Sequence, residues 1–195
     1  MRNPNRTASK RRREAKGDTS NKYDALVIYN SANGSTTEYA KMIAEALDCD
    51  IVPYSRKYIA YASLYRNVIF GTWIRAGELV NLQLLKKNSG NFDLGSKNLI
   101  IYGTGIAPVD DPSYQTFVKD RNSVSDMYFL PGKFDPKKVS KTAKASLGAM
   151  QETMYSQYSD TVENVMRERF KNGYDGISKD AIIPILEDVI STANE

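Results

Sequence analysis

Short apolar runs alternate with amphipathic segments along most of this chain. Each apolar run is rich in β-branched and aromatic residues and predicts a buried strand; the runs lie at residues 24–30, 51–52, 67–71, 98–103 and 127–130. The segments between them have the three- and four-residue apolar spacing of helices; they lie at residues 35–47, 57–65, 78–87 and 112–121. Strands that alternate with helices predict an α/β fold with a parallel, doubly wound sheet.

The chain runs on for more than sixty residues after the last predicted strand. Apolar side chains at roughly helical spacing predict one added helix; they are Phe134, Val139, Ala143, Leu147, Met150 and Met154. A second helical piece at 161–170 and a final helix at 178–192 follow, so residues 133–172 are predicted to be a helical insertion before the last helix. The insertion either covers the sheet or offers a surface to a partner, a second subunit or the membrane interface where quinones reside.

The first strand ends in a polar loop, S-A-N-G-S-T, made of Ser31, Ala32, Asn33, Gly34, Ser35 and Thr36. A helix that begins here directs unpaired N–H groups and its positive dipole end at the loop, which suits a phosphate. The loop lacks the Lys of a triphosphate-binding loop and the glycine spacing of the dinucleotide fingerprint, so a single phosphate fits best. An ordinary helix cap is the alternative.

A second loop follows the third strand in N-V-I-F-G-T-W-I-R-A-G-E-L and contains the only Trp of the chain. This segment resembles the T-W-x-x-G-E-L loop of flavodoxins, with one additional residue. The first loop is similar to their [ST]-x-T-G-x-T pattern, with Asn33 in place of the middle Thr. The resemblance implies a flavodoxin-like five-stranded sheet of order 2-1-3-4-5 that binds FMN. It also implies which residues surround the isoalloxazine ring: Thr72, Trp73, Ile74, Arg75, Ala76 and Gly77. A core position for Trp73 is the alternative.

The fourth strand ends in a third loop, Y-G-T-G-I-A-P, at the edge of the sheet where ligands bind in such folds. Gly103 and Gly105 would let the backbone approach the ring closely. Backbone amides would bond its polar edge; they belong to Thr104, Gly105, Ile106 and Ala107. Tyr114 is a candidate for the other face of the ring, and Tyr102 is expected to pack within the sheet.

The resemblance implies electron transfer through a non-covalently bound FMN, with a redox partner protein or a quinone-like small molecule as partner. The segment L-P-G-K-F-D-P-K-K-V-S resembles flavodoxin-domain proteins related to menaquinone-dependent protoporphyrinogen oxidase, so an FMN-dependent oxidoreductase of that type is the alternative. A second alternative is an interaction module without flavin that uses the basic tail. Arg75 would raise the flavin potential if it points to the ring edge and have little effect if it points to water.

Composition narrows the chemistry. The chain has no His and one Cys, Cys49, which excludes His-based acid–base catalysis, triads, cysteine clusters and an intramolecular disulfide. We therefore expect no catalytic side chain and no metal site, and the chemistry falls to a cofactor. No apolar run reaches the ~18 residues of a membrane span, and the polar N-terminus is unlike a secretory signal, so a cytoplasmic protein is expected.

The basic charge belongs to one end of the chain. Residues 1–22 contain eight Lys or Arg and two acidic residues, while the whole 195-residue chain has a net charge of +4. This segment has almost no apolar residues and is predicted to be a disordered tail before one domain at 23–195. Its K-R-R-R cluster is able to attract nucleic acid or anionic membrane, but no interleaved aromatic is present to stack on bases, so a solubilising or vestigial tail is favoured.

Overall fold

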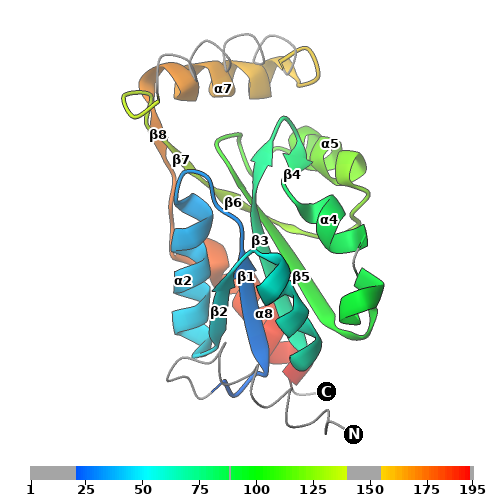
Figure 1. Cartoon of the computed structure of the whole chain (residues 1–195). Helices are drawn as coiled ribbons and strands as arrows, with labels where there is room; N and C mark the ends of the chain where they lie inside the picture. Colours follow the sequence, from blue (N-terminus) through cyan, green and yellow to red (C-terminus); the bar gives the residue numbers. More distant parts are fainter. Residues whose placement is uncertain (1–20, 88, 140–154, 194–195) are drawn as a thin grey trace, which may run out of the picture.

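The computed structural model describes residues 21–87, 89–139 and 155–193, and its centre is a parallel sheet (Figure 1). The parallel strands are β1 (Ala25–Tyr29), β2 (Asp50–Pro53), β3 (Asn67–Arg75), β5 (Asn98–Gly105) and β6 (Tyr128–Pro131). They pair in the order β2-β1-β3-β5-β6. The predicted strands and their predicted order are confirmed, since β5 and β6 are the fourth and fifth predicted strands.

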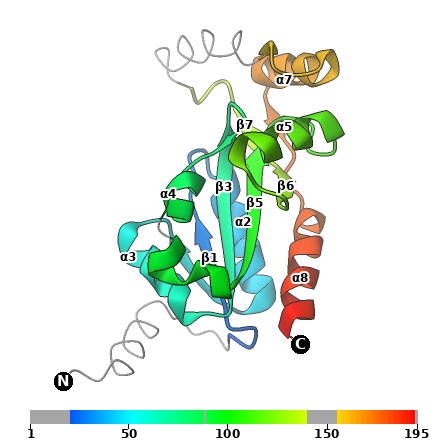
Figure 2. The ribbon, with the colours of Figure 1, turned by 90° about the vertical axis from the view of Figure 1, so that its right-hand side faces the viewer.

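Helices cover both faces of the sheet, and Figure 2 shows α3 and α4 on the side opposite α8. One face packs against α2 (Ser35–Leu47), α8 (Ile183–Ala193) and the short turn η4 (Asp180–Ile182). The elements on the other face are α3 (Arg56–Ile59), η1 (Ala60–Leu64), α4 (Leu82–Lys87), η2 (Ser89–Phe92), η3 (Leu94–Ser96) and α5 (Pro112–Asn122). This is the doubly wound arrangement that the alternating pattern predicts.

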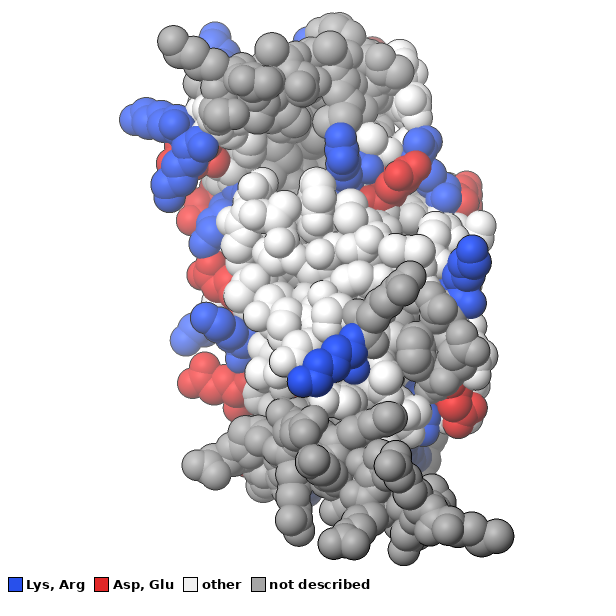
Figure 3. All heavy atoms as spheres, in the orientation of Figure 1, with Lys and Arg blue, Asp and Glu red and all other residues white. Residues whose placement is uncertain are grey.

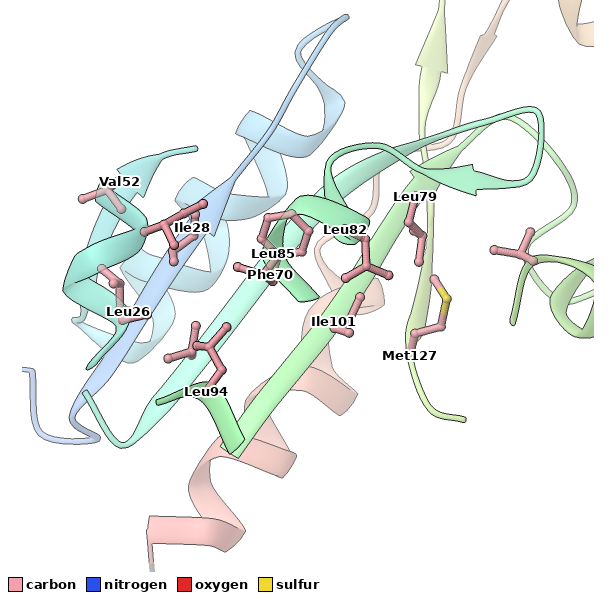
Figure 4. Close-up of a cluster of buried hydrophobic side chains, with 14 of the residues drawn as sticks. Leu26, Ile28, Val52, Phe70, Leu79, Leu82, Leu85, Leu94, Ile101 and Met127 are labelled. Carbon is pink, nitrogen blue, oxygen red and sulfur yellow. The ribbon is translucent and has the colours of Figure 1, made fainter. Parts of the chain in front are cut away.

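The central strands are apolar on both sides because both sides are covered. In β1, Leu26 and Ile28 point to one buried cluster, while Ala25 and Val27 belong to the other. Figure 4 shows Leu26 and Ile28 in a common cluster with Phe70 of β3 and Ile101 of β5. Such continuous apolar runs are typical of parallel strands between two helical layers. The two packed layers hold the strand ends, and the loops that follow them, in fixed positions.

The predicted helix at 78–87 is wrong at its start. Glu78–Leu79 form the strand β4, which pairs antiparallel with the end of β3, and helix α4 begins only at Leu82. Ala76 and Gly77 between the strands have φ values of 51° and 77°. Two central residues with positive φ are the signature of a two-residue hairpin turn that matches the twist of its strands. The second predicted loop is therefore the tip of a β-hairpin.

The chain after β6 forms an insertion at the carboxyl end of the sheet. β7 (Lys133–Phe134) pairs antiparallel with β8 (Tyr174–Asp175), and helix α7 (Asp160–Asn172) lies between them in sequence. Figure 1 shows α7 lying beyond the strand ends, across the top of the sheet. Helix α7 contains the predicted piece at 161–170. The predicted added helix is wrong at Phe134, which lies in β7 because it pairs with Tyr174, and residues 140–154 of that helix lie outside the described residues.

Most of the predicted basic tail, residues 1–20, lies outside the described residues, so the alternative of a flavin-free interaction module that uses this tail stays a prediction. Asn21 is attached to the domain, because its N–H donates to the Asp48 carbonyl over 2.9 Å and its side chain accepts from the Ala25 N–H over 2.8 Å. Within the described ranges, no helix has the length and apolar character to span a membrane. Figure 3 shows one face of the molecule, with a largely uncharged centre and with basic and acidic side chains at its margins.

Candidate functional site

A cavity of about 1500 Å³ lies at the carboxyl edge of the sheet, where the three predicted loops meet. Fourteen of the sixteen predicted site residues line it: Ser31, Ala32, Asn33, Ser35, Thr36, Trp73, Ile74, Arg75, Ala76, Gly77, Thr104, Gly105, Ile106 and Ala107. Gly34 and Thr72 do not. The strand order explains why the three loops lie together. Strands β1, β3 and β5 are neighbours, and their carboxyl ends lie at the same edge of the sheet.

The first loop presents hydrogen-bond donors at the start of α2. Gly34 is the N-cap residue with φ 91°, a conformation that glycine adopts without strain. Its N–H donates to Ser31 Oγ over 3.1 Å, and Ser35 Oγ accepts the N–H of Lys133 over 3.0 Å. Both hydroxyls act as acceptors in these bonds and keep their own protons for donation. Together with the unpaired first N–H groups of α2, they suit an anion at this end of the cavity.

Behind this loop, a buried polar contact fixes α2 to the sheet. The hydroxyl oxygens of Thr36 and Thr104 lie 2.8 Å apart, and both residues are buried. Tyr102 donates its hydroxyl to the Thr36 carbonyl over 3.3 Å. Burial raises the pKa of the Tyr102 hydroxyl, which keeps it a donor. Tyr102 packs within the sheet as predicted.

The hairpin of β3 and β4 forms a second wall. Trp73 is half-buried and lines the cavity, so it is not a core aromatic. Thr72 is buried instead, and its hydroxyl donates to the Val80 carbonyl over 2.7 Å. Asn122 of α5 holds the hairpin from behind: its side chain accepts from the Leu79 N–H at 2.9 Å and donates to the Gly77 carbonyl at 2.7 Å. The hairpin tip is therefore a braced element.

The third loop has two glycines with different roles. A Cβ on Gly103 would lie 2.8 Å from Leu79 and 2.9 Å from Ile74, so this glycine makes room for the hairpin rather than for a ligand. Gly105 lines the cavity, and a Cβ there would meet only ordinary contacts. Tyr114 also lines the cavity but is held edge-on to the aromatic rings of Phe129 and Tyr158.

The sequence pattern missed the wall that the insertion contributes. This wall combines aromatic and apolar side chains with charged ones. The aromatic and apolar residues include Phe134, Tyr158, Met166, Phe170 and Tyr174. The charged residues are Lys133, Asp135, Lys137, Lys138 and Asp175, and Lys133 is the one bonded to the first loop. The rings of Phe134 and Phe170 pack edge to face with centres 5.1 Å apart. The L-P-G-K-F run was visible in the sequence, but nothing local indicated that it pairs with residues 174–175.

Arg169 joins the insertion to the third loop. Its Nη1 donates to the Ile106 carbonyl over 2.7 Å, and its guanidinium lies 3.8 Å from the ring centre of Tyr174. Both contacts belong to residues that line the cavity. Helix α7 is therefore fixed over the site by a directed hydrogen bond as well as by apolar packing.

The sequence model of the flavodoxin domain matches residues 26–162, which include all three loops. The chain belongs to the flavodoxin-domain family. The family is one of flavin-binding redox proteins, and the cavity lies where its loops converge. The narrower resemblance to relatives of protoporphyrinogen oxidase stays a prediction, and no curated protein matches the chain.

Two solved flavodoxin structures are similar to this chain at low identity. Oxidised flavodoxin 2 from Bacillus cereus is 16% identical, with a TM-score of 0.42, over 69% of this chain and 99% of that chain. A WrbA-like flavodoxin from Agrobacterium tumefaciens is 14% identical, with a TM-score of 0.41, over 74% of this chain and 97% of that chain.

Proposed function

We propose that this protein binds FMN in the cavity and transfers electrons through it. The observation that carries the proposal is the convergence of three separate loops on one cavity: the anion-suited start of α2, the Trp73 hairpin and the loop after β5. The flavin would supply the redox chemistry, and the protein would bind and orient it and set its electron affinity.

The residues present fit the two ends of such a ligand. At the α2 end, the Ser31 and Ser35 hydroxyls and the first helical N–H groups suit a phosphate monoester. At the hairpin end, the half-buried Trp73 offers an aromatic face, and Gly105 lines the cavity with backbone alone. The cavity exceeds the roughly 300–1,000 Å³ usual for small-ligand sites, so it has room for a complete flavin mononucleotide.

The test is to purify the full chain, record its visible spectrum, and identify any chromophore that heating releases. We expect FMN to be released, or apoprotein to bind added FMN with quenching of flavin fluorescence. A colourless protein that fails to bind added FMN, FAD and riboflavin would refute the proposal. Release of FAD alone would show that the protein binds a flavin but that its cofactor is FAD and not FMN.

A second candidate, an FMN-dependent oxidoreductase acting on a small quinone-like molecule, is favoured by the insertion wall. A carrier needs an exposed ring edge for a partner protein, whereas α7 and β7 place Phe134, Met166 and Phe170 around the same cavity. These apolar side chains suit a planar, apolar small molecule beside the flavin.

Reduced protein offered a water-soluble quinone or cytochrome c would separate the carrier from the enzyme. If the protein is the enzyme, we expect faster electron transfer to the quinone than to cytochrome c. A Phe170→Ala variant should then slow quinone reduction without slowing cytochrome c reduction. If the protein is a carrier, we expect faster electron transfer to cytochrome c, and the Phe170 substitution should change the rate with neither acceptor.

A further inference from the structure

Lys133 lies at the α2 end of the cavity and lines it. Its backbone N–H donates to Ser35 Oγ, which attaches the start of β7 to the first loop. The preceding residue, Gly132, lets the chain pass close to the third loop. Its N–H donates to the Gly105 carbonyl over 2.6 Å, and a Cβ on Gly132 would lie only 2.9 Å from that oxygen. The path of the chain after β6 therefore carries Lys133 to the loop suited to an anion.

The charges around this end show why a cation matters there. The Lys133 ammonium forms an ion pair with Glu38, an acidic residue in the first turn of α2. Asp175 lies opposite Lys133 in the β7–β8 register and adds a second carboxylate. Like charges repel, so the two carboxylates would oppose a phosphate at the helix start if Lys133 were absent. An ammonium has three N–H donors, so the pair with Glu38 leaves donors for a further acceptor.

We propose that Lys133 is the cation that makes this cavity select a phosphorylated flavin over the same flavin without its phosphate. The inference rests on the proposed flavin function and names a determinant of its ligand specificity. A charge-assisted hydrogen bond to phosphate is available to FMN and not to riboflavin, whose ring is identical. The loop itself stays anchored in side-chain variants, because Ser35 is held by the Lys133 backbone and not by its ammonium.

The test compares the affinities of full-length apoprotein for FMN and riboflavin by quenching of flavin fluorescence. We expect Lys133→Met to lower the ratio of FMN to riboflavin affinity by about five- to tenfold, as loss of one partly exposed charged hydrogen bond implies. Riboflavin affinity should stay within about twofold, and Lys133→Arg should retain most of the FMN preference. Lys179→Met, which removes an exposed lysine outside the cavity, is the matched control and should change neither affinity.

An unchanged affinity ratio in Lys133→Met would overturn the inference, including the case in which both affinities fall together through damage to the fold. Restored FMN preference in a Lys133→Met, Glu38→Gln double variant would overturn the direct hydrogen bond from Lys133 to the phosphate, since Lys133 would then act only by neutralising Glu38. Continued loss of preference in that double variant supports a direct role. Failure of the unmodified protein to bind either flavin would instead refute the proposed function itself.

Discussion

The hydroxyl oxygens of Thr36 and Thr104 lie 2.8 Å apart in the buried layer beneath the cavity. Thr36 stands in the first turn of α2 and Thr104 near the end of β5, so this single contact joins two of the three site loops. Both hydroxyls are buried away from water, and each serves as a hydrogen-bond partner for the other. The position of the helix start relative to the third loop depends on this pair.

Replacement of Thr104 by Val should therefore leave the Thr36 hydroxyl without this partner while it keeps the side-chain shape. We expect the free energy of unfolding to fall by about 1–3 kcal/mol, the usual cost of a buried polar group that loses its hydrogen bond. Urea unfolding of the full chain measures this. Thr116→Val, at an exposed position of α5, is the control and should change stability little. An equal effect in both variants would contradict a special role for the buried pair.

The tip of the β3–β4 hairpin stores backbone strain at one residue. Ala76 has φ 51°, a left-handed conformation that side chains other than those of Asn and Asp resist. Asn-Gly is the preferred pair for this turn, so Ala76→Asn should raise the free energy of unfolding by about 1 kcal/mol. A decrease in thermal stability would show that the turn is not strained at this position.

Gly77 next to it should tolerate no side chain. It has φ 77°, and a Cβ would lie 2.2 Å from the Phe117 ring. Gly77→Ala therefore combines an unfavourable backbone conformation with a steric clash, and we expect a loss of at least about 2 kcal/mol. Gly95→Ala, where a Cβ would meet nothing within 4 Å, is the matched control in the same denaturant titration.

Asp111 should give the protein a share of its acid sensitivity. Its carboxylate caps α5 by accepting the Tyr114 N–H over 3.0 Å, and hydrogen bonds from the Ser113 hydroxyl and this N–H lower its pKa. A carboxyl whose pKa is lower in the folded state stabilises the fold at pH values above its unfolded-state pKa of about 3.9. This stabilisation is lost as the pH falls through the folded-state pKa.

We therefore expect Asp111→Ala to reduce stability at pH 7 by about 1 kcal/mol, the usual cost of a lost N-cap. The difference in stability between wild type and variant should shrink between about pH 5 and pH 2, because the wild-type carboxyl becomes protonated there. Thermal melts across this range provide the measurement. A constant difference at every pH would assign the effect to packing and not to the carboxylate charge.

Arg75 is the cation at the hairpin side of the proposed flavin site. It lines the cavity and is exposed. Reduction adds negative charge to a flavin, so Arg75→Ala should lower the reduction potential of the bound flavin, with a smaller shift at high salt because the side chain is in contact with water. Redox titration tests this against Arg66→Ala, at the exposed residue just before β3 begins, far along the strand from Arg75. An unchanged potential would show that Arg75 does not act on the ring.

The alternating elements, the strand order implied by the flavodoxin motifs, and the three loops that line the cavity could all be predicted from the amino-acid sequence. These features are local: apolar spacing reports which face of a segment is buried, and a strand in a parallel sheet delivers its following loop to a known edge. The same locality failed at Glu78, where apolar spacing suggested a helix but the backbone of Ala76 and Gly77 turned the chain into a hairpin.

The distant residues that complete the site could be found only from the folded chain. Asn122 braces Gly77 and Leu79 from a helix more than forty positions away, and Lys133 contacts Ser35 across 98 positions. The pairing of β7 with β8 placed α7 over the strand ends, and Arg169 fixed it to Ile106. Such contacts leave no period in the sequence, because they depend on where the folded sheet and its two helical layers bring separate segments together.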